Sequence, residues 1–257
     1  MARRLSQILD QWRLRKVQDH WSRVADTSGA MDPFALRALR AEAWAMRRQI
    51  DRVLHVADHR LAVSAPGAGL PRAPLGTDWA WRPDVWRGPI PTPGAVAKDA
   101  RTAISNDLAA YHDCPLGEVV LRQIRNTAEP DRAPFGLTLD VFGFRGSFLS
   151  LAVSLPEAAV SGLKARHLIR VDALIDCDRP VRGFVRLNIK HGPNIEQMVS
   201  ALAPDGREKL VEFDLAYAGI DEARVERAWL DLILNDAAMT RITLRDLAVS
   251  RRPRAEI

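Results

Sequence analysis

The feature that most constrains this chain is a succession of short segments, from about Glu118 to Ser250, in which apolar and polar residues alternate. Loops rich in Gly, Pro, Asp and Asn separate these segments. A period of two puts one row of side chains on a core and the other in water, which is typical of antiparallel sheets. The clearest segments are Gly146–Leu155, His167–Asp176, Gly183–His191, Lys209–Tyr217, Ala228–Asp236 and Arg241–Val249.

About eight or nine such strands are enough to form two packed sheets. We therefore predict a mainly β protein, with an antiparallel, jelly-roll-like β-sandwich over residues 96–257. Residues 95–126 are expected to be an entry region that starts with a short helical or irregular stretch, and the last residues a short exit. Sandwiches of this class often bind ligands without changing them chemically.

Residues 1–62 are predicted to form a helical arm of two amphipathic helices. Apolar residues recur at steps of three and four from Arg3 to Val24. A second helix is expected from Pro33 to about Leu61, with Asp32 as its N-cap. Such helices must pack on each other, on the sandwich or on a partner. The residues proposed for an assembly surface are Trp12, Trp21, Arg13, Arg15 and Lys16.

All of the net charge of +5 lies in this arm. Residues 1–61 contain 12 basic and 7 acidic residues, and the rest of the chain contains 25 of each. The surplus fits a nucleic-acid or membrane contact, or simply a solvated helix face. Because acidic residues interrupt the basic ones and RNA-stacking motifs are absent, we expect no specific nucleic acid and no membrane partner.

Residues 63–95 are rich in Pro and Gly, which indicates a linker rather than a helix. Their second half contains Trp79, Trp81 and Trp86, which are too apolar to leave in a loose linker. We expect this half to wrap around the sandwich. The three indoles either fill surface grooves or form a platform on which sugar rings stack.

Alternation along Arg186–Lys190 and the strands near it predicts a polar sheet face. Its donors and acceptors would suit sugar hydroxyls, although cross-strand ion pairs on a solvated sheet would produce the same pattern. The candidate glycan-binding residues are Arg186, Asn188, Lys190, Asp214, Asp231, Asn235, Trp79, Trp81 and Trp86.

Catalytic signatures are weak. The cluster His112-Asp113-Cys114 has no second cluster to complete a metal or nucleophile site, and we interpret it as a turn before a strand. Asp214 and Asp231 could lie on adjacent strands and act as a glycosidase pair, which stays open as an alternative. We predict no enzyme and no cofactor. A jelly-roll can bind a structural Ca²⁺, but the sequence contains no contiguous Asp-rich loop from which its ligands could be predicted.

The start of the chain is basic and has no continuous apolar stretch, so it is expected to be neither a signal peptide nor a membrane span. Two cysteines, Cys114 and Cys177, cannot form a disulfide framework and are expected to be free thiols in a reducing compartment. We therefore expect synthesis in the cytoplasm. If the protein acts outside the cell, we expect it to be released by a route other than a cleaved signal peptide, such as cell lysis.

Several stretches between Trp79 and Glu256 together resemble an uncharacterised bacterial family of unknown function: WAWRPDVWRGPIPTPG, YHDCPLGEVVLRQIRN, FRGSFLSLAVSLP, RLNIKHGPN, VEFDLAY, AWLDLILND and LRDLAVSRRPRAEI. The plan of arm, linker and jelly-roll resembles a carbohydrate-binding module carried on a helical arm. It also resembles the head-spike proteins of phage-like gene transfer agents, which attach to a capsid and contact surface polysaccharide. These resemblances carry over no catalytic residue.

Together these features predict a non-catalytic binding protein. In the leading hypothesis the arm attaches it to a larger assembly, such as a capsid of a phage-like particle, and the sandwich contacts polysaccharide or a partner spike protein. One alternative is a carbohydrate-active enzyme that uses carboxylates on the same face. Another is a cytoplasmic, envelope-associated protein with a lipid-binding arm.

Overall fold

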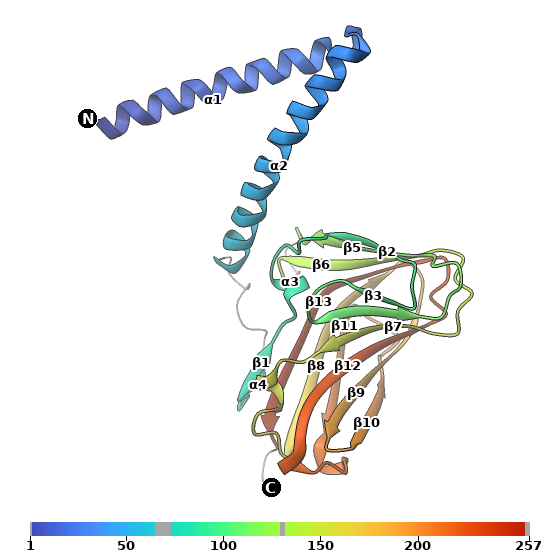
Figure 1. Ribbon diagram of the computed structural model, residues 1–257. Coiled ribbons are helices and arrows are strands. Elements are labelled where there is room, and N and C mark those ends of the chain that lie inside the picture. The colour runs from blue at the N-terminus through green and yellow to red at the C-terminus, as the bar shows by residue number, and fades with distance from the viewer. Residues whose placement is uncertain (1, 65–72, 129–131, 255–257) are drawn as a thin grey trace. The chain divides into compact units, whose positions relative to one another are not determined.

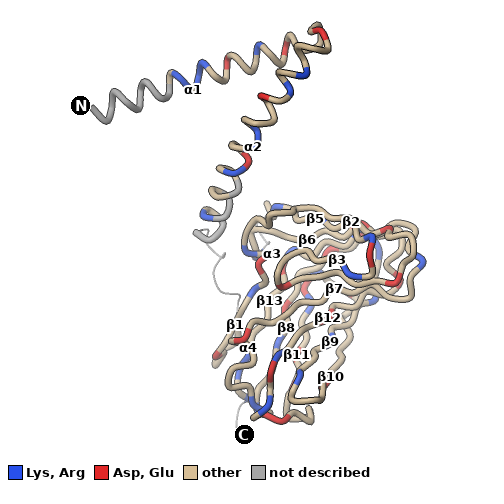
Figure 2. The backbone as a smooth tube through the Cα atoms, viewed as in Figure 1, with Lys and Arg blue, Asp and Glu red and all other residues tan. Residues whose placement is uncertain are grey.

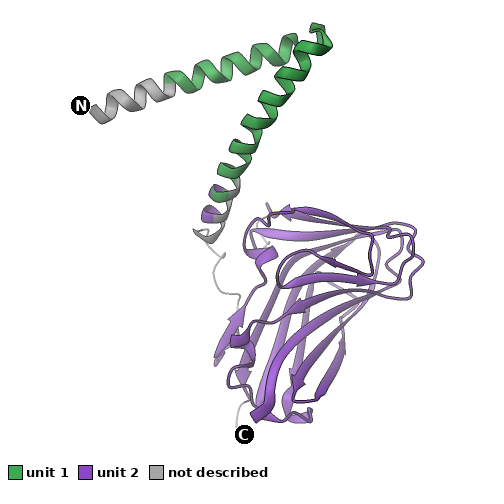
Figure 3. Ribbon diagram, in the orientation of Figure 1, with its two compact units in different colours: residues 1–56 green, residues 57–257 purple. Residues whose placement is uncertain are grey.

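The computed structural model describes residues 2–64, 73–128 and 132–254. The chain divides into two compact units, Met1–Val56 and Ala57–Ile257, which Figure 3 shows in different colours. The first is helical and the second is a β-sandwich.

The helical unit contains α1 (Ala2–Thr27), the short 3-10 helix η1 (Ser28–Ala30) and most of α2 (Pro33–Ser64). The predicted N-cap is confirmed, because Asp32 Oδ1 accepts hydrogen bonds from the N–H groups of Phe34 and Ala35 at 2.9 and 3.0 Å. None of the helices among the described residues is long and apolar enough to cross a membrane.

No described side chain between Trp12 and Val56 is buried, although many of them are large and apolar. Phe34 is 83% exposed and Val53 is 66% exposed. Figure 2 shows basic and acidic residues interspersed along both helices. The described side chains of the two helices therefore do not form a core between them.

Within the described residues, the sandwich is built from thirteen strands, all of them in two antiparallel sheets (Figure 1). The strands are β1 (Trp79–Trp81), β2 (Gly94–Ala97), β3 (Arg101–Ala103), β4 (Leu108–His112), β5 (Val119–Arg125), β6 (Phe135–Val141), β7 (Leu149–Ser154), β8 (His167–Cys177), β9 (Arg182–His191), β10 (Asn194–Ala201), β11 (Glu208–Asp214), β12 (Val225–Asn235) and β13 (Thr240–Pro253). Four short helices lie between them: α3 (Asp84–Arg87), α4 (Glu157–Val160), η2 (Leu215–Tyr217) and η3 (Glu222–Arg224).

The seven-stranded sheet has the order β11-β8-β13-β6-β5-β2, with β1 pairing on β13, and the six-stranded sheet has the order β10-β9-β12-β7-β4-β3. From β6 onward the chain changes sheet at every connection except the β9–β10 hairpin. That hairpin turns at Gly192 (φ +56°) and Pro193. The predicted antiparallel, jelly-roll-like sandwich with N-terminal helices is confirmed.

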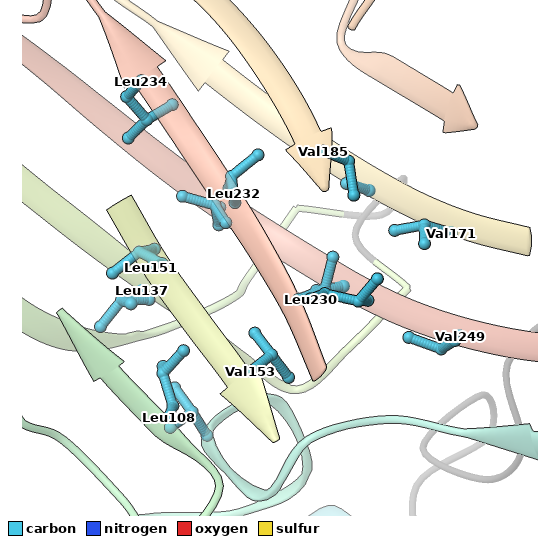
Figure 4. Packing of buried hydrophobic residues seen from close by; sticks show 14 of the residues in the cluster. Leu108, Leu137, Leu151, Val153, Val171, Val185, Leu230, Leu232, Leu234 and Val249 are labelled. Carbon is cyan, nitrogen blue, oxygen red and sulfur yellow. The ribbon is translucent and has the colours of Figure 1, made fainter. Parts of the chain in front are cut away.

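The core lies between the two sheets. Figure 4 shows Leu137, Val171 and Val249 of the seven-stranded sheet facing residues of the six-stranded sheet such as Leu151 and Leu232. The alternation predicted for β9 is confirmed, because its core residues are buried. Each buried Leu or Val removes enough apolar area to contribute about 1.5–3 kcal/mol.

Two local predictions are wrong. The stretch after Gly94 is not helical or irregular, because it forms the edge strands β2 and β3. The predicted exit at Arg251–Ile257 does not begin at Arg251, since β13 continues to Pro253 and pairs with β8 as far as His167; residues 255–257 lie outside the described residues. In both places the backbone pairs with a neighbouring strand, and tertiary pairing of this kind overrides a weak local pattern.

The Trp-bearing segment is built into the sandwich. Strand β1 pairs with β13, and the indole Nε1 of the fully buried Trp86 donates to the Leu244 carbonyl at 2.9 Å. Gln123 of β5 holds the next turn, donating to the carbonyls of Val85 and Gly88 at 2.7 Å each. This part of the segment is therefore a strand and a buried anchor.

A buried ion pair fixes this segment to β13. Arg82 Nε and Nη2 donate to Asp246 Oδ1 and Oδ2 at 2.8 and 3.0 Å, and the two side chains are only 3% and 7% exposed. Asp246 lies at a register shift in the β13–β8 pairing. The two hydrogen bonds of a bidentate pair offset the free-energy cost of burying its two charges. If one partner is removed, the remaining buried charge destabilises the folded state.

We predict that Arg82→Met lowers the free energy of unfolding by about 3–5 kcal/mol, because Asp246 is left buried without its guanidinium. Denaturant unfolding of the full chain measures this. The matched control is Arg182→Met, which breaks the exposed pair with Asp236 and should cost at most about 1 kcal/mol. Equal effects of the two substitutions would contradict the importance of the buried pair.

Candidate functional site

A groove lies on the outer face of the six-stranded sheet, with a volume of about 680 Å³. Its floor is β7, whose outward residues Ser150, Ala152 and Ser154 are all small. Bulkier side chains rise on both sides of this floor, Trp229 and Ile233 from β12 and Tyr111 from β4. The hollow therefore follows from side-chain size along one central strand.

A polar network occupies the β12 side of the groove. Arg186 and Asp231 are direct cross-strand partners, and Arg186 Nε and Nη2 donate to Asp231 Oδ2 at 3.0 and 2.8 Å. The fully buried Asn188 donates to the same oxygen at 2.9 Å and accepts from Gln197 Nε2 at 2.9 Å. Asp231 Oδ1 accepts no hydrogen bond from any described residue, which leaves an acceptor for a ligand.

Two more residues complete the walls. Arg227 lies at one end of the groove, with its guanidinium carbon 5.2 Å from the centroid of the Trp229 ring. Phe148 lies just before β7 and is 42% exposed. The site therefore combines aromatic surface with a rigid arrangement of donors and acceptors.

Asp113 holds the loop that carries Phe148. Its carboxylate accepts from the Ser147 hydroxyl at 2.6 Å and from the N–H groups of Ser147 and Phe148 at 2.7 and 3.2 Å. These hydrogen bonds, that of the Ser147 hydroxyl above all, lower the pKa of Asp113. A Cβ on Gly146 would lie 2.4 Å from Asp113 Oδ1, so glycine is required for this close approach.

The ring of His112, beside Asp113, is close to backbone groups of the protein. Nδ1 of the buried His112 accepts from the Cys114 N–H at 3.1 Å, and its Nε2 lies 3.1 Å from the Ala97 carbonyl. Both cysteines are free thiols. Within the described residues, no three His, Cys, Asp or Glu side chains come together as a possible metal site.

The structure brings together only part of the predicted glycan face. Arg186, Asn188 and Asp231 meet in the network, whereas Lys190 pairs with Glu226 beside the groove and Asn235 lies further along β12. These residues share the outer face of one sheet. Their role in binding stays a prediction.

Asp214 was wrongly placed on this face. It ends β11 in the seven-stranded sheet, accepts from the Ala216 N–H at 3.0 Å and pairs with Arg254 at 3.2 Å. Alternation shows which residues of a strand point outward, but it does not show which sheet the strand joins. Asp214 and Asp231 therefore cannot form the carboxylate pair that the enzymatic alternative required.

The three tryptophans were also wrongly placed on this face. Trp86 is fully buried in the core, and Trp79 and Trp81 stack at 6.5 Å on β1 of the other sheet and pack against the core. The packing interpretation of these indoles is therefore confirmed. The aromatic residues of the groove were not predicted; they are Tyr111, Phe148 and Trp229. Only Trp229 had a sequence signal, since it alternates with Asp231.

The outer face of the seven-stranded sheet is different. Arginine–carboxylate pairs cover it, including Arg122–Asp140–Arg241 and Arg207–Asp176–Arg245. These charges satisfy one another, as expected for cross-strand pairs on a solvated sheet. The groove on the six-stranded sheet is thus the better candidate for a ligand.

A family model described as a family of unknown function (DUF6478) matches residues 1–257. The chain belongs to this family. Membership of the DUF6478 family assigns no catalytic or binding residue, and it confirms the predicted relationship to an uncharacterised family. A search of curated proteins finds no match.

Solved structures are similar to this DUF6478 protein only weakly. A family 11 carbohydrate-binding module of Clostridium thermocellum in complex with a mixed-linked tetrasaccharide is 12% identical, with a TM-score of 0.38 over 62% of this chain and 97% of that one. The C-terminal family 22 module of Xyn10B from the same organism is 10% identical, with a TM-score of 0.38 over 72% and 100%. Tailspike protein 4 of bacteriophage CBA120 is 4% identical, with a TM-score of 0.40; the match covers 56% of this chain and 19% of the tailspike. TM-scores this low carry no information on what this chain binds.

We predict that acid weakens the charged outer face of the seven-stranded sheet. Burial alone would raise the pKa of Asp140, but hydrogen bonds from Arg241 and Arg122 outweigh it and lower that pKa; Arg207 and Arg245 do the same for Asp176. A lowered pKa in the folded state means that the stabilisation is complete above the unfolded value of about 3.9 and is lost as the pH falls through the folded value.

The measurement is the free energy of unfolding between pH 7 and pH 2 for the wild type, Asp140→Asn and Asp176→Asn. The stability gap between wild type and each variant should be largest at neutral pH and shrink below about pH 4. Asp205→Asn, in the exposed loop before β11, is the control. A gap that stays constant down to pH 2 would contradict the prediction.

Proposed function

We propose that this protein is a non-catalytic binding protein whose six-stranded sheet binds polysaccharide in the groove. The observation that carries the proposal is the fixed network of Arg186, Asn188 and Asp231 beside the Trp229 ring. A sugar presents hydroxyls that both donate and accept, and an apolar face that stacks on aromatic rings. The groove offers both kinds of contact side by side.

The network supports binding because its geometry is set before a ligand arrives. Asp231 Oδ2 receives three N–H donors, which fixes the carboxylate and leaves Oδ1 as an acceptor. Asn188 is held from both sides, by Asp231 and Gln197. Pre-ordered groups reduce the entropy that binding would otherwise cost.

Catalysis is not part of the proposal. Asp231 is the single carboxylate that lines the groove among the described residues, and it is engaged by Arg186. Glycoside hydrolysis commonly needs two carboxyl groups across the scissile bond. The arrangement supports recognition of a chain and offers no second acid or base.

We further propose that the helical arm attaches the protein to a larger assembly. Its described side chains include large apolar residues such as Trp12, Phe34 and Trp44, and none of those between Trp12 and Val56 is buried. Lys16 lies over the Trp12 ring at 3.7 Å, Arg13 and Arg15 are exposed, and Trp21 is half-buried. An apolar, basic surface of this kind suits a protein partner with acidic residues.

The identity of that assembly stays a prediction. A capsid of a phage-like particle is the form that the sequence suggested, with the sandwich facing surface polysaccharide or a partner spike protein. Synthesis in the cytoplasm followed by release on a particle belongs to the same proposal. Electron microscopy of particles from producing cells, with the protein labelled, tests it directly.

We predict that Trp229→Ala weakens binding of the recognised polysaccharide at least tenfold, because a buried aromatic contact is worth more than about 1.4 kcal/mol. A glycan array identifies the polysaccharide, and titration calorimetry on the full chain measures the loss. Tyr217→Ala is the matched control, since Tyr217 is 80% exposed on η2 after β11 of the other sheet. No binding to any glycan by a folded wild type would overturn the proposal.

For the arm, we predict that Phe34→Glu and Trp44→Glu together abolish capture of the protein by its assembly, since a charge cannot enter an apolar contact. Affinity purification from producing cells measures capture. Gln49→Glu is the control for added charge on the same helix. Undiminished capture of the double variant would contradict docking through this surface, and salt-sensitive flotation with anionic liposomes would favour the lipid-binding alternative instead.

A further inference from the structure

We propose that the groove selects anionic polysaccharides, specifically chains that contain uronic acid carboxylates; this inference rests on the proposed function. It deepens that function by naming the class of ligand. The groove contains two arginines and one carboxylate among its described lining residues. A third arginine, Arg101, lies next to its Tyr111 end.

The arginines around the groove differ in what they bind. Arg186 is committed to Asp231, so the charges of this pair cancel. No carboxylate of a described residue lies within 4.0 Å of the guanidinium groups of Arg227 or Arg101. The site therefore has two positive charges that form no ion pair with any carboxylate in the part of the chain that the structure describes.

Aromatic rings hold these two arginines in place. Arg227 lies over the Trp229 ring at 5.2 Å, and Arg101 Nε donates to the Tyr111 hydroxyl at 3.0 Å. A guanidinium against a ring keeps its N–H groups available, and it pairs with carboxylates in a bidentate way. A sugar ring on Trp229 would bring a carboxylate substituent close to Arg227.

The two guanidinium groups mark the ends of an extended site. The pairing of β12, β7, β4 and β3 places Arg227 and Arg101 about 20 Å apart along the strands and about 14 Å apart across them. A single sugar cannot reach both. A chain with repeated carboxylates can, and contact with each charge would then add to the affinity.

The outer face of the seven-stranded sheet differs from the groove in how its arginines are paired. On the seven-stranded sheet, Asp140 and Asp176 each form ion pairs with two arginines. Beside the groove, Glu226 pairs with Lys190 and not with the adjacent Arg227, although it lies close enough for Arg227 to favour its ionised form. Arg227 and Arg101 thus differ from the paired arginines on the other sheet, although the chain after residue 61 is balanced in charge.

The experiment measures binding of the full chain to a panel of uronate polysaccharides, such as alginate, polygalacturonate and glucuronoxylan, each beside its own carboxyl-reduced form. The reduced form keeps the sugar chain and removes the charge. We expect at least about tenfold tighter binding of a carboxylated form, falling as salt rises from 50 to 500 mM (on the scale over which salt screens exposed charges).

Variants locate the effect. Arg227→Gln should reduce the preference for the carboxylated form at least about fivefold, and Arg101→Gln should reduce it further when combined. Arg166→Gln removes the same charge from an exposed loop before β8 and should leave the preference unchanged. Both readouts are ratios between two ligands, so a general loss of stability does not mimic the expected result.

Three results would overturn the inference in different ways. Equal binding of carboxylated and reduced forms, or binding of neutral glycans alone, would leave a polysaccharide-binding groove without charge selection. An unchanged preference in Arg227→Gln would place the selecting charge elsewhere. Absence of binding to every charged and neutral glycan by a folded wild type would overturn the proposed function together with this inference.

Discussion

Successive side chains of a β-strand point to opposite faces, and every other property of this sandwich depends on that constraint. Because the two sheets face each other, the inward row of each strand must be apolar, as Leu151, Leu187 and Leu230 show. All polar chemistry is then left to the outer faces. On the outer face of the seven-stranded sheet, arginines and carboxylates form ion pairs with one another. On the outer face of the six-stranded sheet, small residues, aromatic rings and the Arg186–Asp231 network line a groove.

The same constraint explains how much of the fold and the site could be predicted from the sequence. The period of two identified β7, β8, β9, β11, β12 and β13 and the outward position of Arg186, Asn188 and Asp231, because both are local properties of one strand. It could not show that β11 and β12 belong to different sheets, so Asp214 was wrongly grouped with Asp231. Sheet membership depends on contacts between distant strands, which a single sequence does not display.

Aromatic residues illustrate the same limit. The local sequence around a tryptophan in a Pro-rich segment does not show whether its side chain is buried in the core, as that of Trp86 is, or exposed to solvent. The aromatic residues of the groove come from three separate places in the chain, Tyr111, Phe148 and Trp229, and only the pairing of β4, β7 and β12 brings them together. These three residues become neighbours only when the sheet has folded.

The small side chains on β7 have a consequence for how this protein can change. Ser150, Ala152 and Ser154 form the floor of the groove, while the inward residues of the same strand, Leu151 and Val153, belong to the core. The depth of the groove and the stability of the fold are therefore encoded at different positions of one strand. Substitutions on the floor can reshape the groove while the packing between the sheets is preserved, so the shape of this outer face can change without loss of the sandwich.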